Sequence, residues 1–430
     1  MSTLDPRLPL LQNTDLNGKV VLVRVDHNVV EKGVIKDPFR IDSTFGTIHH
    51  IASKGGFPVL MTHVGRTRDK KTGRVKTGPD TSVLPIVEYL NRKIRGGFVA
   101  AELPADPDFG IVDLDFAKLE PLVKSLKARE IGGIYLPNTR WFAGEESKDD
   151  KTKALAEFFA KFADVFANDA FGSWQPHAST FDIVGKVPVS VAGFLLQKEL
   201  IGLERVLNPE KPFLGVVAGA KYDTKIGPLL KLYEKTDRLL LGGVIYNAFL
   251  AAKYDVKIKG VDDEDVKLAK DLVAKDKDAG KILEPGVLVE SELLESRDPA
   301  KVKLARIKDF KPGDSRGYFL DVAPESFDDP KLGEAIASAK TVFINAVMGF
   351  TPNFFEGSQR FYAEVAKNKG AKKLYGGGDT LQELKTLNPG VYLQALEDDS
   401  YYFFTGGGAV LTAIEDGAYG IKPVGALLKG

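Results

Sequence analysis

Short apolar runs alternate with helical patterns along the whole chain of 430 residues. The run Val20–Val25 is β-branched and apolar except for Arg24, as expected for a strand buried on both faces of a parallel sheet. Apolar residues then recur at helical spacing over residues 45–52, and Gly55 and Gly56 end that helix. Because strand and helix keep alternating in this way, the sequence predicts an α/β fold with parallel sheets covered by helices.

The alternation pauses once, at residues 192–208, where an amphipathic helix is followed by Pro209. We place the domain junction there, between an N-terminal domain of residues 1–191 and a C-terminal domain of residues 209–412. The predicted strands are 20–25, 58–62, 97–100, 133–136 and 165–167 in the first domain, and 213–217, 239–241, 286–289, 318–320, 342–344 and 374–375 in the second. Ligands of such sheets bind at the carboxyl ends of the strands, so the residues just after each strand are the candidates for a site.

Composition excludes several functions. Lysine and arginine total 59, as do aspartate and glutamate, and this balance gives no support to nucleic-acid binding. Without cysteine there is no disulfide or thiolate catalysis, and no histidine pair has zinc-binding spacing. The N-terminus lacks a signal-peptide pattern, and no apolar run approaches the ~18 residues of a membrane span. We therefore expect a soluble, cytoplasmic protein.

Two glycine turns near the end of the chain each follow an apolar strand. The first is Gly376–Gly378, and the second is Gly406–Gly408. Thr380 and Glu383 have the spacing of a capping box, which predicts that a helix starts at Thr380. The free N–H groups and the dipole of a helix N-terminus suit a phosphate, and Asp379 beside them could hold Mg²⁺. The alternative is that both are merely tight turns.

Basic residues follow the strands of the first domain. In a chain without net charge, this clustering favours a small anionic ligand, since arginine pairs its N–H donors with carboxylate and phosphate. The alternative is that each arginine closes a surface ion pair. The candidate residues, with the polar residues among them, are Arg24, Asp26, Asn28, Arg40, His63, Arg66 and Arg140.

Two lysines follow the first strand of the second domain. Lys221 and Lys225 are one helical turn apart and could face a phosphate together. The stretch is neither a Walker A loop nor a Gly-x-Gly-x-x-Gly turn, so no standard nucleotide motif accounts for it.

These stretches resemble the phosphoglycerate kinase family along nearly the whole chain. The similarity is carried by residues 23–29, 62–66, 138–142, 168–172, 177–180, 191–195, 219–221, 225–227, 376–380 and 405–409, in this order. The resemblance implies two Rossmann-like domains whose parallel sheets face a central cleft, a hinge helix between them, and a tail, residues 413–430, that packs back on the first domain. It also implies a monomer that transfers a phosphoryl group between ATP and the carboxylate of 3-phosphoglycerate in glycolysis, making 1,3-bisphosphoglycerate and ADP.

The resemblance further implies roles for individual residues. The basic and polar set of the first domain would hold 3-phosphoglycerate, and Mg²⁺ would come with the nucleotide near Asp379. Catalytic roles fall to Arg40, Lys221, Gly377 and Gly407. The nucleotide would be held by Gly219, Ala220, Lys221, Lys225, Gly243, Asn345, Gly376, Gly377, Gly378, Asp379 and Thr380.

The sequence departs from the family in functional loops. Residues 171–179 are one residue shorter than usual and lack the family's substrate-side arginine, and Pro352 stands where a glutamate would hold the nucleotide ribose. An active phosphoglycerate kinase is therefore one hypothesis, and a divergent member with reduced or lost activity, acting as an anion-binding, nucleotide-binding or regulatory protein, is another. A glycosyltransferase-like enzyme is the third, which the paired Lys221 and Lys225 argue against.

These departures lead to a prediction about nucleotide selectivity. Pro352 cannot accept a hydrogen bond from ribose, and loss of such a charged partner weakens binding by about one to two decades. Calorimetric titration with Mg²⁺ should find ADP, GDP and inorganic tripolyphosphate binding with similar, weak affinity. Tight binding with a strong preference for ADP would show that other contacts replace the lost glutamate.

Overall fold

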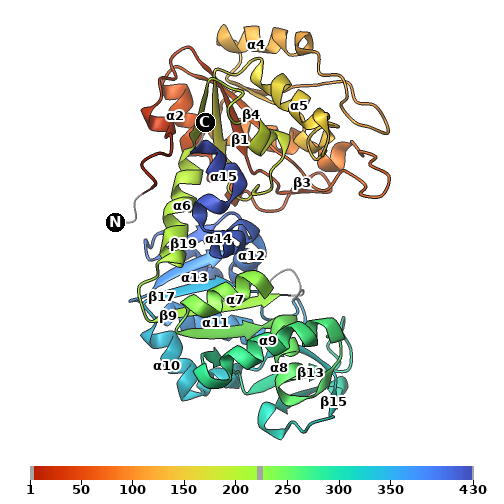
Figure 1. Ribbon diagram of the computed structural model, residues 1–430, viewed down its shortest axis with the longest axis vertical. Coiled ribbons are helices and arrows are strands. Elements are labelled where there is room, and N and C mark those ends of the chain that lie inside the picture. Colours follow the sequence, from red (N-terminus) through yellow and green to blue (C-terminus); the bar gives the residue numbers. More distant parts are fainter. Residues whose placement is uncertain (1–3, 220–225, 429–430) are drawn as a thin grey trace. The chain divides into compact units, whose positions relative to one another are not determined.

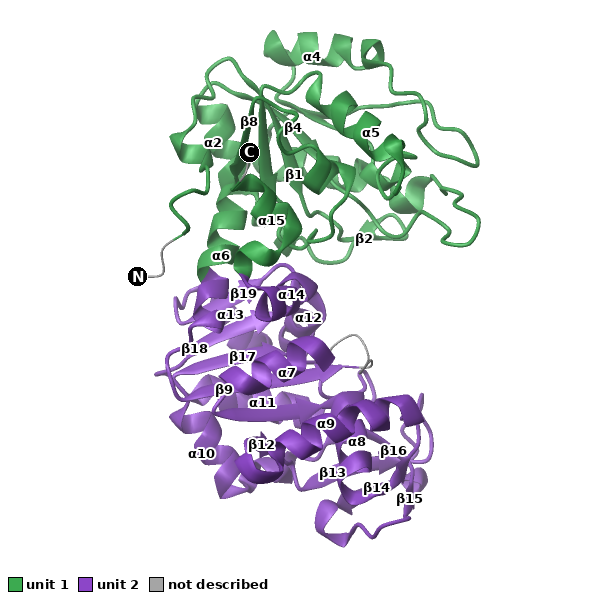
Figure 2. Cartoon of the chain, viewed as in Figure 1, with its two compact units in different colours: residues 1–201, 418–430 green, residues 202–417 purple. Residues whose placement is uncertain are grey.

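The structure, a computed structural model, describes residues 4–219 and 226–428. Residues 1–201 with 418–430 form one compact unit, unit 1, and residues 202–417 form the other, unit 2 (Figure 2). The boundary after residue 201 lies inside α6 (Phe194–Leu207), the helix that the sequence predicts at the junction. Residues 413–416 lie in α14 (Gly407–Asp416) and belong to unit 2, whereas α15 (Lys422–Leu427) groups with unit 1.

Unit 1 is built on a six-stranded sheet in which every pair of neighbours is parallel. In sheet order the strands are β5 (Phe98–Ala100), β6 (Gly133–Tyr135), β4 (Phe57–Met61), β1 (Val20–Val25), β7 (Val165–Asp169) and β8 (Val189–Ala192). The last of these, β8, is absent from the predicted strands.

Alternate residues of β1 point to opposite faces of this sheet, as the pleat requires. Val20 and Leu22 pack with α4 (Glu120–Lys127) and α5 (Asp150–Ala160), whereas Val21 and Val23 pack with α2 (Phe45–Ser53) and α3 (Leu84–Ile94). Figure 1 shows α2 on one side of the strands β1 and β4 and α5 on the other. Because both faces are covered, the strand can be apolar throughout, which is the pattern that the sequence shows.

Unit 2 repeats the arrangement. Its six-stranded parallel sheet has the order β12 (Ile282–Leu283), β10 (Arg238–Gly242), β9 (Phe213–Gly219), β17 (Thr341–Asn345), β18 (Lys372–Gly376) and β19 (Tyr401–Phe404). Its helices are α7 (Ile226–Lys235), α8 (Gly243–Tyr254), α9 (Asp263–Ala279), α10 (Pro330–Ser338), α11 (Glu356–Lys367), α12 (Gly378–Leu387), α13 (Pro389–Leu396) and α14 (Gly407–Asp416).

Two predicted parallel strands are assigned to the wrong sheet. The runs 286–289 and 318–320 form β13 (Val287–Ser291) and β16 (Tyr318–Val322), which pair antiparallel with each other, while β14 (Val302–Arg306) adds to β13. One face of this small sheet buries its apolar residues against Phe354. A short apolar run identifies a strand but carries no information about the direction of its partner, so the sequence alone could not separate these strands from the main sheet.

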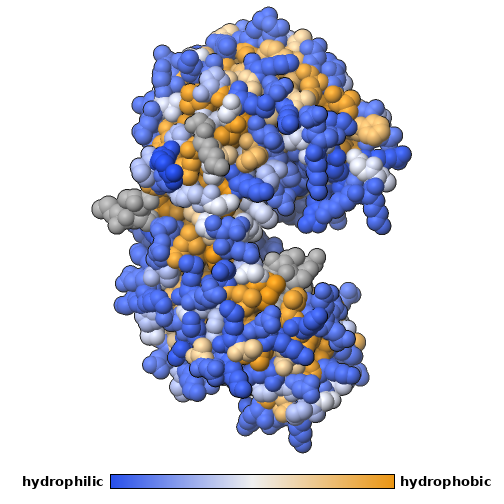
Figure 3. All heavy atoms as spheres, in the orientation of Figure 1, coloured by the Kyte–Doolittle hydropathy of each residue, from blue (hydrophilic) through white to orange (hydrophobic). Residues whose placement is uncertain are grey.

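The remaining elements are short. They are α1 (Phe39–Asp42), α15 (Lys422–Leu427), β2 (Val30–Glu31), β3 (Val34–Ile35), β11 (Lys257–Ile258), β15 (Ser315–Arg316), and the single turns η1 (Leu11–Asn13), η2 (Pro79–Thr81), η3 (Phe116–Lys118), η4 (Thr139–Trp141), η5 (Ala178–Asp182), η6 (Pro299–Lys301), η7 (Ile307–Asp309), η8 (Pro324–Asp328) and η9 (Ala418–Gly420). Over the ranges 4–219 and 226–428, every helix is too short or too polar to cross a bilayer. The face drawn in Figure 3 is predominantly hydrophilic.

Core packing gives a test of the fold. Phe166 on β7 is fully buried, so Phe166→Ala should lower the free energy of unfolding by about 3–5 kcal/mol. Phe109 is 56% exposed, and Phe109→Ala should change it by less than about 0.5 kcal/mol. Urea denaturation of both variants measures the difference, and equal effects would mean that the sheet is packed differently.

Candidate active site

Predicted ligand residues of unit 1 gather at the carboxyl edge of its sheet. Asp26 and Asn28 follow β1, His63 follows β4, and Arg140 lies in η4 after β6. Since parallel strands all end at one edge, residues far apart in the sequence meet there. Arg40 joins them from α1, where its Nη1 lies 3.2 Å from Oδ2 of Asp26.

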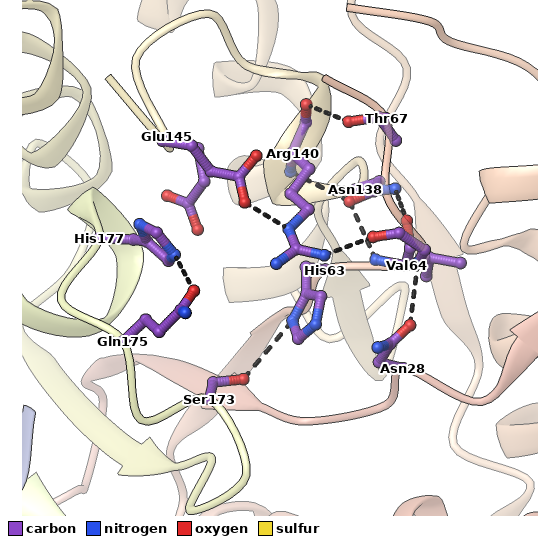
Figure 4. A network of polar contacts seen from close by, with 12 residues as sticks. Asn28, His63, Val64, Thr67, Asn138, Arg140, Glu145, Ser173, Gln175 and His177 are labelled. Carbon is purple, nitrogen blue, oxygen red and sulfur yellow. Dashed lines mark hydrogen bonds and ion pairs between the residues drawn. The ribbon is translucent and has the colours of Figure 1, made fainter. Parts of the chain in front are cut away.

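Backbone groups of the loop after β4 hold two of these side chains. Oδ1 of Asn28 accepts a hydrogen bond from the Gly65 N–H at 2.8 Å, and Arg140 Nη1 donates to the Gly65 carbonyl at 2.5 Å (Figure 4). Arg140 Nε also pairs with Glu146 Oε1 at 2.9 Å. Each contact fixes the direction of a side chain, so the polar edge is organised by the protein itself.

Arg24 faces inward rather than toward solvent. Its side chain is 1% exposed, and its guanidinium donates to Ser179 Oγ at 2.8 Å and to the Val25 carbonyl at 2.5 Å. Burial lowers the pKa of Arg24, while Glu145 opposes that shift. A third N–H points at Nδ1 of His63, 3.2 Å away. Within this arrangement Arg24 reaches a ligand only through His63.

The contact with Arg24 determines the tautomer of His63. Arginine has no acceptor, so Nδ1 of His63 must accept, and the ring proton lies on Nε2. Burial, aided by Arg24, Arg140 and Arg40, holds the pKa of His63 well below its usual 6.5. The imidazole is therefore neutral and has one N–H that can be donated to an anion.

Sequence reasoning missed the residues that support this edge. Glu145 is buried and accepts from the Ser179 N–H at 3.0 Å and from its hydroxyl at 2.5 Å, so Ser179 links Glu145 to Arg24. Asn138 is fully buried and bonds Val64 through both its N–H and its carbonyl. Asn138 lies in a stretch that carries the family resemblance, and this was the sequence signal that could have identified it.

Arg66 differs from the other arginines. It is exposed, and no ion pair to it occurs among the residues that the structure describes. Its position after β4 leaves it available to a ligand at the same edge.

The two glycine turns of unit 2 meet. Gly377 has a φ of +115° and precedes α12, and Gly407 begins α14. A Cβ added to Gly407 would lie 2.7 Å from the Gly377 Cα, closer than side chains tolerate. Asn345, at the end of β17, donates to the Gly376 carbonyl at 2.6 Å beside this contact. The N-termini of two helices therefore point their free N–H groups into one region.

The predicted capping box is wrong. Helix α12 begins at Gly378, with Gly377 as its N-cap, so Thr380 and Glu383 lie inside the helix. Thr380 Oγ1 accepts from the Ala346 N–H at 3.1 Å, and Glu383 accepts from the Tyr362 hydroxyl at 2.7 Å. Spacing of three places both side chains on one face of a helix, and here that face is buried rather than capping the end.

Other nucleotide-site candidates lie at the same edge or outside the described residues. Gly219 and Gly243 form a backbone bridge between the ends of β9 and β10, and a Cβ on Gly243 would lie 3.0 Å from the Gly219 carbonyl oxygen. Asp379 is exposed in the first turn of α12. The remaining candidates, Ala220, Lys221 and Lys225, lie outside the described residues. Within residues 4–219 and 226–428 no cluster of three His, Asp or Glu could hold a metal ion.

Two buried carboxyl groups lie beneath the loop after β17. Asp321 accepts from the N–H of Gly357 at 2.8 Å, and Glu383 reaches Tyr362. Burial raises the pKa of each to about 7, and the charge of Glu383 adds to the shift of Asp321. The loop itself is attached at Gly349, whose N–H donates to Ser358 at 2.9 Å.

Together these features define a class of protein: a two-unit α/β protein with arginines at the carboxyl edge of one sheet and glycine-lined helix N-termini at the other sheet, an arrangement that suits anionic, phosphorylated ligands. Comparison with known proteins gives the family. A model of the phosphoglycerate kinase family matches residues 11–417, and the chain belongs to that family. It is thus a phosphotransferase with a carboxyl group as acceptor.

Individual relatives agree. Phosphoglycerate kinase of Streptococcus thermophilus is 33% identical over 413 residues, covering 94% of this chain and 96% of that protein. The enzyme of Dictyoglomus turgidum is 31% identical, with 94% and 95% covered. The structure of phosphoglycerate kinase from Coxiella burnetii matches with a TM-score of 0.74 and 25% identity over 98% of this chain and 99% of that one.

The buried Glu383 predicts a pH dependence. Its pKa is about 7 in the fold against a usual 4.5, so the folded chain binds an extra proton between these values and loses stability as pH rises through that window. Glu383→Gln keeps an acceptor for Tyr362 but carries no charge. Its stability relative to the unmodified chain should therefore increase by about 1–3 kcal/mol between pH 5 and pH 8.

Denaturant unfolding at the two pH values measures this change. Glu397→Gln, at an exposed position, is the matched control and should show no such trend. A constant difference between Glu383→Gln and the unmodified chain at both pH values would contradict the buried, titrating carboxyl.

Proposed function

We propose that the chain transfers a phosphoryl group reversibly between ATP and the carboxylate of 3-phosphoglycerate, giving ADP and 1,3-bisphosphoglycerate. The convergence of Gly377 and Gly407 carries this proposal, because the two glycine backbones pack against each other and so bring two helix N-termini, which suit phosphate, next to one another. Family membership supports the same reaction over the divergent, regulatory alternative.

The acceptor belongs to unit 1. The guanidinium groups of Arg40, Arg66 and Arg140 supply positive charge for the phosphate and carboxylate of 3-phosphoglycerate, and Asn28 with the Nε2–H of His63 supplies neutral donors. Asp26 orients Arg40 through their 3.2 Å ion pair. Arg24 acts through His63, since its side chain is buried and its Nη2 lies 3.2 Å from His63 Nδ1.

The reaction needs no general base. A carboxylate acceptor is ionised at neutral pH and can attack directly. The residues therefore have to align the two reactants and offset negative charge on the moving phosphoryl group, which is how phosphoryl transfer is generally catalysed. A neutral His63 in the site agrees with this requirement, because nothing in the step asks it to take up a proton.

The nucleotide belongs to unit 2. Gly219, Gly243, Asn345 and the turn Gly376–Gly378 form the described part of its site, and Ala220, Lys221 and Lys225 complete the proposed set. Thr380 contributes by bonding Ala346, which supports the turn from below. Mg²⁺ bound to the nucleotide phosphates would supply further positive charge there.

The donor set fits a metal that arrives with the nucleotide. Asp379 is a single exposed carboxylate in the first turn of α12, and Mg²⁺ commonly uses one or two protein carboxylates together with phosphate oxygens and water. A cytoplasmic location and a monomeric state remain predictions from the sequence.

The proposed reaction can be tested directly. A coupled assay with 3-phosphoglycerate and Mg-ATP should detect turnover, and Arg40→Ala or Lys221→Ala should each reduce kcat on the order of 10²–10³-fold, because each removes a positive charge from the transition state. Arg92→Ala, at an exposed position of α3, is the matched control and should be unaffected. Undiminished rates in both site variants would refute the assignment.

A further inference from the structure

His27 lies between two residues of the acceptor site, Asp26 and Asn28, yet its side chain is fully buried. Its ring nitrogens contact different elements. Nδ1 lies 2.9 Å from the Tyr135 hydroxyl at the end of β6, and Nε2 lies 3.0 Å from the Thr44 hydroxyl between α1 and α2. The imidazole thus touches two segments from which site residues project, and it cannot itself touch a ligand.

The protons of this contact can be assigned. The Thr44 hydroxyl has one proton and donates it to the Ile41 carbonyl at 2.8 Å, so it accepts from His27 Nε2–H. Nδ1 is then the acceptor, and the Tyr135 hydroxyl donates to it. A one-way chain of hydrogen bonds results, from Tyr135 through His27 and Thr44 to Ile41.

This chain of hydrogen bonds requires a neutral His27 ring. A protonated imidazole would present a second N–H to Tyr135 and could no longer accept from it. Burial, aided by the neighbouring Arg24 and opposed by Asp26, lowers the pKa of His27 to about 3. His27 therefore stays neutral at any pH at which the fold is ordinarily studied.

Each end of this hydrogen-bond chain lies in a segment that carries a site residue. Thr44 lies two residues beyond the end of α1, the helix that carries Arg40, and its hydroxyl donates to the carbonyl of Ile41, the residue after Arg40. Tyr135 ends the strand that continues to Asn138 and Arg140. The main chain of His27 is also fixed, because its N–H donates to Thr62 Oγ1, next to His63, at 2.9 Å.

We propose that His27 is a positioning residue for the acceptor: its neutral imidazole joins the Asp26–Asn28 loop to the segment of Arg40 and to the strand leading to Arg140. The inference rests on the proposed function, in which these residues hold 3-phosphoglycerate. Its consequence is specific. Loss of the hydrogen-bond chain through His27 should loosen the acceptor site while leaving the nucleotide site of unit 2 unchanged.

A double-mutant cycle separates positioning from mere stability. His27→Phe removes the acceptor of the Tyr135 hydroxyl, and Tyr135→Phe leaves Nδ1 of His27 without its donor, so each single variant should unfold at lower denaturant concentration. The double variant removes both polar groups and should recover much of that loss, because apolar groups of similar shape replace the pair.

Affinity for the acceptor should not recover with stability. In both single variants and in the double variant, KM for 3-phosphoglycerate should rise about tenfold, as expected when one hydrogen bond's worth of positioning is lost, with KM for ATP changed less than about twofold. Calorimetric binding of 3-phosphoglycerate to the full chain provides a readout that is independent of turnover.

Tyr246→Phe is the matched control. Tyr246 is a fully buried tyrosine of unit 2 whose hydroxyl donates to the Pro285 carbonyl at 3.2 Å. It should lose stability without a change in KM for 3-phosphoglycerate. If His27→Phe does not fold, the isosteric Tyr135→Phe carries the test.

The possible outcomes are distinct. A double variant with the KM of the unmodified chain would overturn the positioning role and leave His27 a structural residue. An unmodified chain that neither binds 3-phosphoglycerate nor transfers phosphate would overturn the proposed function and, with it, this inference. A raised KM for 3-phosphoglycerate in a double variant that has recovered its stability supports the positioning role of His27.

Discussion

A parallel strand buried on both faces can place polar side chains almost only at its ends, and this constraint organises both units. In β1 the apolar residues alternate between two cores, and polarity begins where the strand ends. Arg24 is the exception. It remains inside because Ser179 accepts one N–H and passes the contact on to the buried Glu145, so cation and carboxylate are compensated without touching. Leaving either charge alone at that depth would cost several kcal/mol.

Ion pairs within unit 1 compensate much of the positive charge at the edge of its sheet where the site residues lie. Arg40 pairs with Asp26, Arg140 pairs with Glu146, and His63 is neutral, so the charge of these two arginines is largely compensated, whereas Arg66 has no ion pair within the described residues. In residues 171–179, where the resemblance leads us to expect an arginine, this chain has neutral groups: Ser173 Oγ lies 3.5 Å from His63 Nδ1, and Gln175 Oε1 lies 3.3 Å from His177 Nε2. Recognition of an anion therefore depends on hydrogen-bond donors whose directions the protein already fixes. Small displacements of these donors should weaken anion binding more than they would in a site with a large excess of positive charge.

Sequence reasoning identified what is local and missed what is distant. Apart from β8 and β12, the strands of both main sheets follow from apolar runs and spacing, as does the helix at residues 45–52, because period and length suffice for them. The partners of β13 and β16 depend on segments elsewhere in the chain, so their antiparallel sheet was not predicted. The motif Thr380-x-x-Glu383 was misread because the glycine at 377 already permits the turn into the helix.

The same limit applies to the candidate site. Position after a strand predicted Asp26, Asn28, His63 and Arg140 at one edge, since topology alone brings them there. It could not predict that Arg24 turns inward, because that depends on Ser179 and Glu145, which are remote in sequence. His27 showed no metal-binding spacing, and its role emerges only when Tyr135 and Thr44 are seen on either side of the ring.

The two units stabilise their sites by opposite electrostatic means. Beneath the acceptor site, a buried imidazole with a pKa of about 3 keeps one protonation state across the neutral range, so the His27 chain does not change with pH. Beneath the loop after β17, Asp321 and Glu383 have pKa values of about 7, so both gain charge as pH rises through neutrality. Two like charges in a buried region repel, and the loop above them is held to α11 by Ser358, which lies beside Glu383. Rising pH should therefore loosen the loop after β17 in unit 2 before it affects the hydrogen bonds of His27 that support the acceptor site in unit 1.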